Sequence, residues 1–294
     1  MNTLVKEKSV LEMRNICKYF PGVRALQNVD FTLCEGEIHA LMGENGAGKS
    51  TLIKVLTGVY EKDEGEIFLK GLDKPAVIRS PQDAQKLGIS TVYQEITLCP
   101  NLTVAENMYI GRTKGIGMSW KKMNEGADKI LKSLGIPAEA TQQLSSCSIA
   151  IQQMVAIARA VDMECKVLIL DEPTSSLDDQ EVEKLFGLMR DLKAKGVGII
   201  FVTHFLDQVY EVCDKITVLR DGQLVGEYEI ETLPRVQLVA KMLGKELDDM
   251  SEIRDDSLVY SGADASENVL EAEGLQSNAG IKPFNFHIKK GEVN

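Results

Sequence analysis

The chain has 294 residues, 44% hydrophobic and 26% charged, with a formal net charge of −11. These values are typical of a globular protein with one large domain or two ordinary ones. The acidic balance argues against a nucleic-acid-binding surface, which needs clustered lysine and arginine. No apolar run approaches the roughly 18–20 residues that cross a bilayer as a helix. The six cysteines contain no C-x-x-C pair and are expected to be reduced thiols.

Apolar periodicity predicts alternating strands and helices up to about residue 245. Strands are expected over residues 10–16, 29–33, 37–42, 65–69, 89–93, 166–170, 197–203, 216–219 and 224–227. A turn is expected over 18–22, and helices over 51–57, 81–87, 104–110, 123–134, 149–161, 179–195, 206–212 and 234–243. Strands alternating with helices predict an α/β fold with a largely parallel sheet. The helical texture from about 95 to 163 indicates a helical insertion between sheet elements.

A glycine-rich run follows the strand expected over residues 37–42 and precedes a helix. It consists of Gly43, Glu44, Asn45, Gly46, Ala47, Gly48, Lys49, Ser50 and Thr51, and fits the phosphate-loop pattern G-x-x-x-x-G-K-S/T. A strand, such a turn and a helix direct backbone N–H groups and a helix N-terminus at a phosphate chain. Lys49 is expected to reach the β- and γ-phosphates of a nucleoside triphosphate, and the Ser50 hydroxyl to bind Mg²⁺.

Two carboxylates, Asp171 and Glu172, end the aliphatic strand expected over 166–170. Open α/β sheets place their ligands at such strand ends. Adjacent side chains there point in different directions, so the two acids can have different roles. We expect Asp171 to hold Mg²⁺ through water, and Glu172 to polarise the water that attacks the γ-phosphate.

Together these motifs resemble an ABC-type ATPase domain over about residues 10–245. The set comprises the phosphate loop, Asp171-Glu172, Ser176-Leu177-Asp178, Gln94 opening the helical insertion, and His204 ending the strand over 197–203. The resemblance implies a P-loop ATPase core with a mostly parallel sheet, an antiparallel β part and an inserted helical subdomain, using ATP and Mg²⁺. It also implies that Gln94 contacts Mg²⁺ and signals to the transporter, that His204 contacts the γ-phosphate, and that Asp178 communicates across a dimer. Phe20, or alternatively Tyr19, would stack on adenine.

The family's signature, L-S-G-G-Q before a helix, is altered in this chain. Alignment on the following Gln-Gln-Met-Val run puts Cys147-Ser148-Ile149-Ala150-Ile151 in its place, so that Ser148 alone is kept. Ile149 and Ala150 replace glycines, and their Cβ atoms would obstruct the approach of backbone to phosphate. In the family this segment serves the nucleotide of the opposite domain. We therefore expect the composite site that uses Ser148 to bind ATP but to hydrolyse it poorly.

The chain changes character after residue 245. Residues 246–267 are acidic and polar, which is typical of a solvated linker. Residues 269–275 then echo 10–16, and 286–293 echo 31–38, at a nearly constant offset. This is a duplication on the scale of a domain. We expect residues 268–294 to begin a second, truncated ATPase domain whose strands, without the partners of a complete domain, are loosely held or packed in a non-native way.

The duplicated chain is similar to the ATPases of bacterial monosaccharide importers, in which two ATPase domains are fused. The resemblance also rests on the Gln-Gln-Met-Val run and on Pro-Gly-Val-Arg-Ala-Leu at 21–26. The resemblance implies a peripheral subunit on the cytoplasmic face of the membrane. Its partners would be membrane permease subunits, a second ATPase domain and, indirectly, a periplasmic or extracellular sugar-binding protein, with no nucleic acid. Residues 95–112 would face the permease. The alternatives are a soluble twin-domain ABC ATPase acting on ribosomes or DNA, and a catalytically silent nucleotide-binding module.

Overall fold

The computed structural model describes residues 9–94, 98–111, 119–244, 268–277 and 281–289. The chain divides into two units, Met1–Lys245 and Glu246–Asn294. The predicted linker over 246–267 lies outside the described residues. Among the helices described, none is long and apolar enough to cross a membrane.

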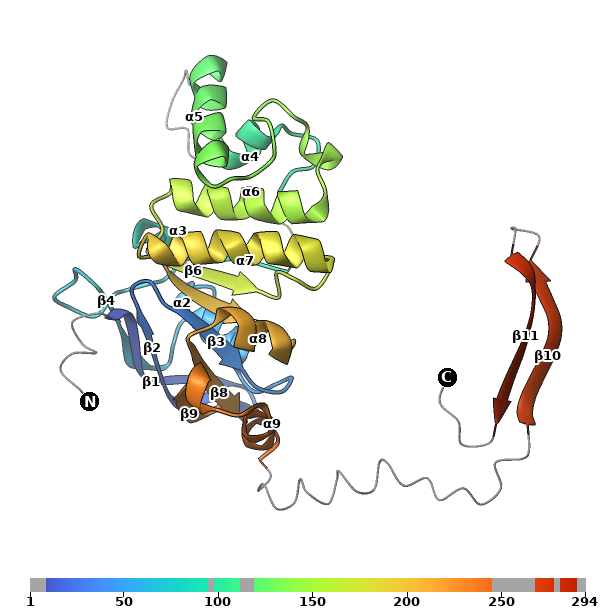
Figure 1. The fold of residues 1–294 in the computed structure, drawn as a ribbon. Helices are drawn as coiled ribbons and strands as arrows, with labels where there is room; N and C mark the ends of the chain where they lie inside the picture. Colours follow the sequence, from blue (N-terminus) through green and yellow to red (C-terminus); the bar gives the residue numbers. More distant parts are fainter. Residues whose placement is uncertain (1–8, 95–97, 112–118, 245–267, 278–280, 290–294) are drawn as a thin grey trace. The chain divides into compact units, whose positions relative to one another are not determined.

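A six-stranded sheet forms the centre of the first unit (Figure 1). Its order is β5 (Ile89–Val92), β6 (Val167–Asp171), β7 (Gly198–Val202), β3 (Ile38–Met42), β8 (Lys215–Arg220) and β9 (Gln223–Glu229). The first five strands are parallel and β9 runs antiparallel to β8. The mostly parallel sheet is therefore confirmed, and all parallel strands deliver their carboxyl ends to one edge.

A separate antiparallel sheet consists of β2 (Val23–Cys34), β1 (Ser9–Phe20) and β4 (Glu64–Leu69), in that order. The turn expected over residues 18–22 is wrong in its extent, because β1 continues to Phe20 and pairs there with Val23. Pro21 and Gly22 alone make the turn, with Gly22 at φ 79°. Pairing with β2 thus keeps Tyr19 and Phe20 in the strand, although the Pro-Gly pair that follows them indicated a turn from residue 18.

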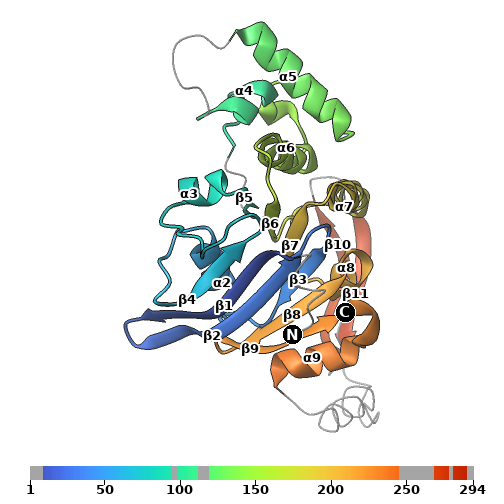
Figure 2. The same ribbon diagram turned by 90° about the vertical axis from the view of Figure 1, so that its left-hand side faces the viewer.

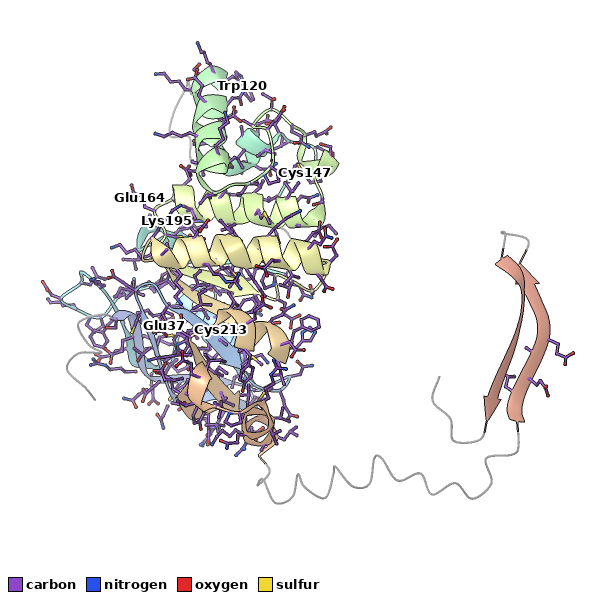
Figure 3. All side chains as sticks on the ribbon, in the orientation of Figure 1. Glu37, Trp120, Cys147, Glu164, Lys195 and Cys213 are labelled. Atoms are coloured by element: carbon purple, nitrogen blue, oxygen red, sulfur yellow. The ribbon has the colours of Figure 1, made fainter. Side chains whose placement is uncertain are left out.

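Helices cover both faces of the central sheet (Figures 1 and 2). They are α2 (Lys49–Leu56), α3 (Pro81–Lys86), α4 (Val104–Tyr109), α5 (Trp120–Ser133), α6 (Ile149–Asp162), α7 (Asp179–Ala194), α8 (Leu206–Val212) and α9 (Arg235–Leu243). One core joins a face of the sheet to α4–α9, and a second joins the other face to α2 and the antiparallel sheet. The helices α4 and α5 stand beyond α6 as a lobe, with Trp120 of α5 65% exposed (Figure 3).

The second unit contains a β-hairpin of β10 (Asn268–Ser277) and β11 (Ile281–Lys289). Its register repeats that of β1 and β2. The pairs Leu11–Leu33, Glu12–Thr32 and Met13–Phe31 correspond in order to Leu270–Ile288, Glu271–His287 and Ala272–Phe286. Asn15 and the corresponding Gly274 both have positive φ, 50° and 62°. The sequence echo is therefore matched by the backbone pairing.

Candidate functional site

The phosphate loop leaves the end of β3 and enters α2, as the sequence predicts. Gly43, Gly46 and Gly48 have φ values of 147°, 85° and 106°, in the region that favours glycine. A Cβ at Gly43 would lie 2.3 Å from the carbonyl oxygen of Leu219, and one at Gly48 would lie 2.9 Å from that of Ala25. Two of the glycines are thus required both by backbone conformation and by close packing.

Lys49 lies across the loop from which it emerges. Its Nζ donates hydrogen bonds to the carbonyl oxygens of Gly43, at 2.7 Å, and Glu44, at 3.0 Å. Burial lowers the pKa of this ammonium, although the charges of Glu172 and Asp171 act in the opposite direction. A partly desolvated ammonium beside the loop is suited to interact with an anion.

The two carboxylates stand at the end of β6, as predicted. Burial and the neighbouring charge of Glu172 raise the pKa of Asp171, against the opposing effect of Lys49 and Lys54. Glu172 has φ 48°, a conformation that residues other than glycine rarely adopt. Its N–H donates to the carbonyl oxygen of Val202 on β7 at 2.8 Å. The backbone at Glu172 is thus strained and held from the neighbouring strand, as is common at functional sites.

One cavity of about 380 Å³ brings the loop and the carboxylates together. Its lining comprises Val23, Arg24, Ala25, residues 45–51, Asp171, Glu172, Val202, Asp221 and Gly222. Sequence reasoning missed Val23–Ala25 as part of this site, and the Asp221-Gly222 pair is by sequence a signal for a tight hairpin turn, with no phosphate-binding motif. The Gly222 N–H donates to the Ala47 carbonyl oxygen at 3.1 Å, so the β8–β9 turn supports the phosphate loop. The Asp-Gly pair was the available signal, but its place under the loop depends on tertiary packing.

His204 follows β7 and stands beside Glu172. Its Nδ1 lies 3.4 Å from Glu172 Oε1, and its side chain is 59% exposed. The His204 ring also contacts Phe205, with ring centroids 4.0 Å apart. Glu172 and His204, which the sequence analysis gave separate roles, are therefore adjacent in space, although 32 positions separate them in the chain.

An aromatic hollow adjoins the phosphate cavity. It is lined by Tyr19, Phe20, Gly22, Val23 and Arg24, and the last two residues also line the phosphate cavity. The Phe20 ring meets Tyr60 edge-on, with centroids 5.2 Å apart, while Tyr19 is 40% exposed. Both candidates for an adenine contact therefore lie beside the phosphate cavity.

Gln94, Ser148 and Asp178 are not among the residues that line this cavity. Gln94 is exposed just after β5. Ser148 caps α6 and accepts a hydrogen bond from the Ile151 N–H, and Asp178 caps α7 by accepting one from the Glu181 N–H. These three residues lie outside the site that this chain builds by itself.

A family model described as "ABC transporter" matches residues 26–175. The chain belongs to the ABC transporter family. This ABC transporter chain is 48% identical over 293 residues to the galactofuranose transporter ATP-binding protein YtfR of Escherichia coli strain K12. It is 46% identical over 293 residues to the fructose import ATP-binding protein FruK of Bifidobacterium longum strain NCC 2705. Each alignment covers 99% of this chain and 57% of the relative, so the chain spans little more than half of these relatives.

Solved structures confirm the fold of this ABC transporter chain. The ADP conformation of MJ1267, an ATP-binding cassette of an ABC transporter, matches with a TM-score of 0.71 at 28% identity, covering 80% of this chain and 97% of that one. A nucleotide-free ATP-binding cassette from an ABC transporter matches with a TM-score of 0.66 at 26% identity, covering 86% of this chain and 98% of that one. The fold is the expected ABC ATPase fold.

Proposed function

We propose that the chain is the ATP-binding and ATP-hydrolysing part of an ABC importer for a sugar. One observation carries the ATPase proposal: a single cavity is lined by the glycine-rich loop, Lys49, Asp171 and Glu172. The loop offers backbone N–H groups and a cation to a phosphate chain, and the adjacent strand end offers two acids. Binding and hydrolysis of a nucleoside triphosphate need this combination.

The donor set fits Mg²⁺. Burial and the charge of Glu172 disfavour the ionised form of Asp171, and a cation would relieve that cost. Ser50, which lines the same cavity, and Asp171 would hold the ion, with Gln94 joining them after a movement of the segment that follows β5. When bound, Mg²⁺ would neutralise charge on the β- and γ-phosphates.

For hydrolysis, Glu172 would accept a proton from the attacking water, and His204 would contact the γ-phosphate beside it. Lys49 would exchange its two carbonyl partners for phosphate oxygens. The aromatic hollow would hold the adenine ring, through Phe20 or Tyr19.

The altered signature supports unequal sites in a two-domain assembly. Ser148 is exposed at the N-terminus of α6, and the adjacent Ile149 side chain is 49% exposed. Ala150 is 3% exposed and points into the core, so Ile149 is the residue that would crowd a phosphate. We infer that a site completed by Ser148 holds ATP but turns it over slowly, with Asp178 communicating between the two sites.

Import of a sugar is supported by the relatives. One is named as a galactofuranose transporter ATP-binding protein and the other as a fructose import ATP-binding protein. A second ATPase domain is supported by β10 and β11, whose register repeats that of β1 and β2. We infer that this hairpin is the first hairpin of a second ABC domain, and that the relatives' additional length contains the rest.

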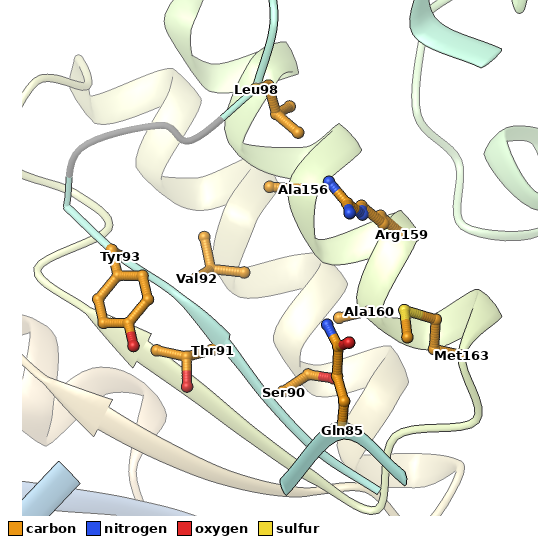
Figure 4. Close-up of a pocket in the computed structure, with 10 residues that line it drawn as sticks. All are labelled: Gln85, Ser90, Thr91, Val92, Tyr93, Leu98, Ala156, Arg159, Ala160 and Met163. Atoms are coloured by element: carbon orange, nitrogen blue, oxygen red, sulfur yellow. The ribbon is translucent and has the colours of Figure 1, made fainter. Parts of the chain in front are cut away.

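A membrane permease is the partner that an import subunit needs, and we infer its contact site from a groove beside α6. A groove of about 200 Å³ lies between β5 and α6, lined by Ser90, Thr91, Val92 and Tyr93 on one side and by Ala156, Arg159, Ala160 and Met163 on the other (Figure 4). Leu98 lines it too, and Arg159 donates to the Ile110 carbonyl oxygen at 3.2 Å. The groove thus borders the segment over 95–112 that the family resemblance assigns to permease contact, although residues 95–97 and 112 are outside the described residues. We infer that a permease segment enters this groove, on the cytoplasmic face of the membrane, and that a sugar-binding protein delivers the substrate on the other side.

The proposal is tested by removing the loop's cation. In Lys49→Ala, ATP affinity measured by calorimetry on the full-length chain should fall by at least about 10-fold, because a charge-assisted contact with the phosphates is lost. Lys195→Ala removes an exposed positive charge that does not line the cavity and should change the affinity by less than about twofold. Unchanged ATP affinity in Lys49→Ala would contradict the proposed site.

A further inference from the structure

Two connections at the carboxyl edge of the sheet carry the proposed hydrolytic pair. Glu172 opens the connection from β6 to α7, and His204 lies in the turn from β7 to α8. The separation between Glu172 Oε1 and His204 Nδ1, 3.4 Å, therefore depends on how these connections are held together. The φ of Glu172, 48°, is strained, and such conformations persist only where the surroundings enforce them. Contacts that hold the connection at Glu172 are therefore required.

One backbone hydrogen bond joins the two connections, at the point where they leave β6 and β7. The Glu172 N–H donates to the Val202 carbonyl oxygen at 2.8 Å, which continues the β6–β7 pairing to the residue before Thr203. Beyond that bond the connections diverge, toward α7 and α8 respectively. A second interaction, made by the residues that follow Glu172, is needed to fix the direction in which the chain leaves Glu172.

Gln208, on α8, supplies this second interaction, because its side-chain oxygen accepts hydrogen bonds from both connections. The Thr174 hydroxyl donates to Gln208 Oε1 at 2.7 Å, and the Thr203 hydroxyl donates to the same oxygen at 3.4 Å. A carboxamide oxygen has two lone pairs and can accept both. Thr203 Oγ1 itself accepts the Phe205 N–H at 3.1 Å, which orients its hydroxyl.

Burial increases the energetic cost of losing these hydrogen bonds. Thr174 is 4% exposed and Thr203 is 3% exposed, so water has little access to either threonine. A buried hydroxyl that loses its partner keeps the cost of its desolvation. Thr174 lies two residues after Glu172 and Thr203 immediately precedes His204, so the bridge acts on the backbone at both members of the pair.

We propose that Gln208 is a positioning residue for ATP hydrolysis, fastening the connection after Glu172 to the turn before His204 and so holding these two side chains side by side. Hydrogen bonds from Thr174 and Thr203 link Gln208 to the backbone at both members of the pair. The inference rests on the proposed ATPase function and adds the residue that aligns the proposed base with the proposed γ-phosphate contact.

The test compares variants of the full-length chain by kcat, KM, ATP affinity from calorimetry and thermal unfolding. Gln208→Leu removes the acceptor and should lower kcat on the order of 10–100-fold, because small misplacements of reacting groups cost that much. KM and ATP affinity should stay within about twofold, since the phosphate loop is untouched. Gln208→Glu keeps an oxygen that accepts both hydroxyls and should retain most of the activity. Glu211→Leu is the matched control, because Glu211 lies one turn along α8 and pairs with Arg190 instead, at 3.3 Å.

Thr174→Val provides an independent variant that preserves side-chain shape and removes the 2.7 Å bond alone. It should lower kcat several-fold, about 3–10-fold, again without weakening ATP binding. It decides the matter if Gln208→Leu fails to fold by its unfolding profile. Wild-type kcat in Gln208→Leu or in Thr174→Val, or equal losses in Gln208→Leu and Gln208→Glu, would overturn the positioning role while leaving the proposed ATPase intact. A wild-type chain that neither binds nor hydrolyses ATP would overturn both proposals.

Discussion

The imidazole of His204 lies beside the carboxylate of Glu172, with 3.4 Å between Nδ1 and Oε1. Their places at the ends of neighbouring parallel strands, β7 and β6, produce this pairing. His204→Ala should therefore lower kcat for ATP hydrolysis by about 100–1000-fold, because a group that contacts developing charge on the γ-phosphate is lost. ATP affinity should stay within about threefold, since the loop and Lys49 supply most of the binding. Steady-state kinetics with calorimetry checks both; a variant with unchanged kcat would remove His204 from the reaction.

Asp171 is predicted to destabilise the nucleotide-free protein. Its pKa is raised in the folded state by burial and by Glu172, so the ionised form opposes folding once the pH exceeds the ordinary value of 3.8, and the full cost is present above the raised pKa. Asp171→Asn should therefore increase the free energy of unfolding at pH 7, by at most about 0.5–1 kcal/mol because solvent partly screens this half-buried group. It should also lose the additional stability that Mg²⁺ with ATP gives the wild type. Thermal unfolding with and without Mg²⁺ and ATP measures this.

The exposed Asp73→Asn is the control for Asp171, because it removes the same charge from an acidic protein. It should leave both the unfolding free energy, within about 0.5 kcal/mol, and the ligand response unchanged. Lower stability of nucleotide-free Asp171→Asn would contradict the inference that burial and Glu172 disfavour the ionised form of Asp171.

A buried polar network beside β3 and β8 is predicted to make stability depend on pH. His39 is 0% exposed, and its ring nitrogens lie 2.7 Å from Glu37 Oε1 and 2.7 Å from Thr217 Oγ1. Burial alone would raise the pKa of Glu37 (labelled in Figure 3), but the hydrogen bond and charge of His39, with the charge of Lys215, lower it below the ordinary value of 4.5. An acid whose pKa is lowered on folding stabilises the protein above its unfolded-state pKa, and this stability is lost as the pH falls through the lower folded-state pKa.

Urea unfolding from pH 7 to pH 3 tests that network. Glu37→Gln should lower the free energy of unfolding at pH 7 by about 1–3 kcal/mol, since a charge-assisted bond to His39 is lost. The variant should also lose less stability than the wild type as the pH falls below about 4.5. Parallel pH profiles for the two proteins would show that Glu37 does not carry the dependence.

The groove between β5 and α6 is predicted to receive a permease segment. Gln85 lies exposed on α3 and lines the groove, whereas Gln82 is exposed on the same helix and is not a lining residue. Gln85→Trp should obstruct the groove and reduce co-purification with the permease by about 10-fold or more, as expected when bulk replaces fit at an interface. ATP affinity should be unchanged. Gln82→Trp is the matched control, and equal permease recovery in the two variants would place the contact elsewhere.

Local patterns in the sequence predict most elements of the first unit, because their apolar periodicity and their end signals agree. The helix expected over 179–195 is found as Asp179–Ala194, with a capping box from Asp178 and Glu181. The end of β1 was missed because Pro21-Gly22 indicates a turn, while the pairing of Phe20 with Val23 that extends the strand depends on β2. Local signals thus identify an element, and long-range pairing decides where it ends.

The candidate site divides in the same way. Gly43–Thr51, Asp171 and Glu172 could be predicted because each belongs to a contiguous motif with its own strand. Ala25 and Gly222, which pack against the loop, carry no phosphate-binding motif and enter the site only through the fold. The link from Thr174 through Gln208 to Thr203 is likewise invisible in sequence, since it joins three elements by side chains of ordinary type.

The most direct test of the account separates ATP binding from ATP hydrolysis at Glu172. In Glu172→Gln the side chain keeps its size but loses its basicity, so ATP affinity by calorimetry should stay within about twofold while turnover falls by at least about 100-fold and uncleaved ATP accumulates on the protein. Wild-type turnover in Glu172→Gln would contradict the central claim that this carboxylate activates water for attack on a triphosphate held by the loop.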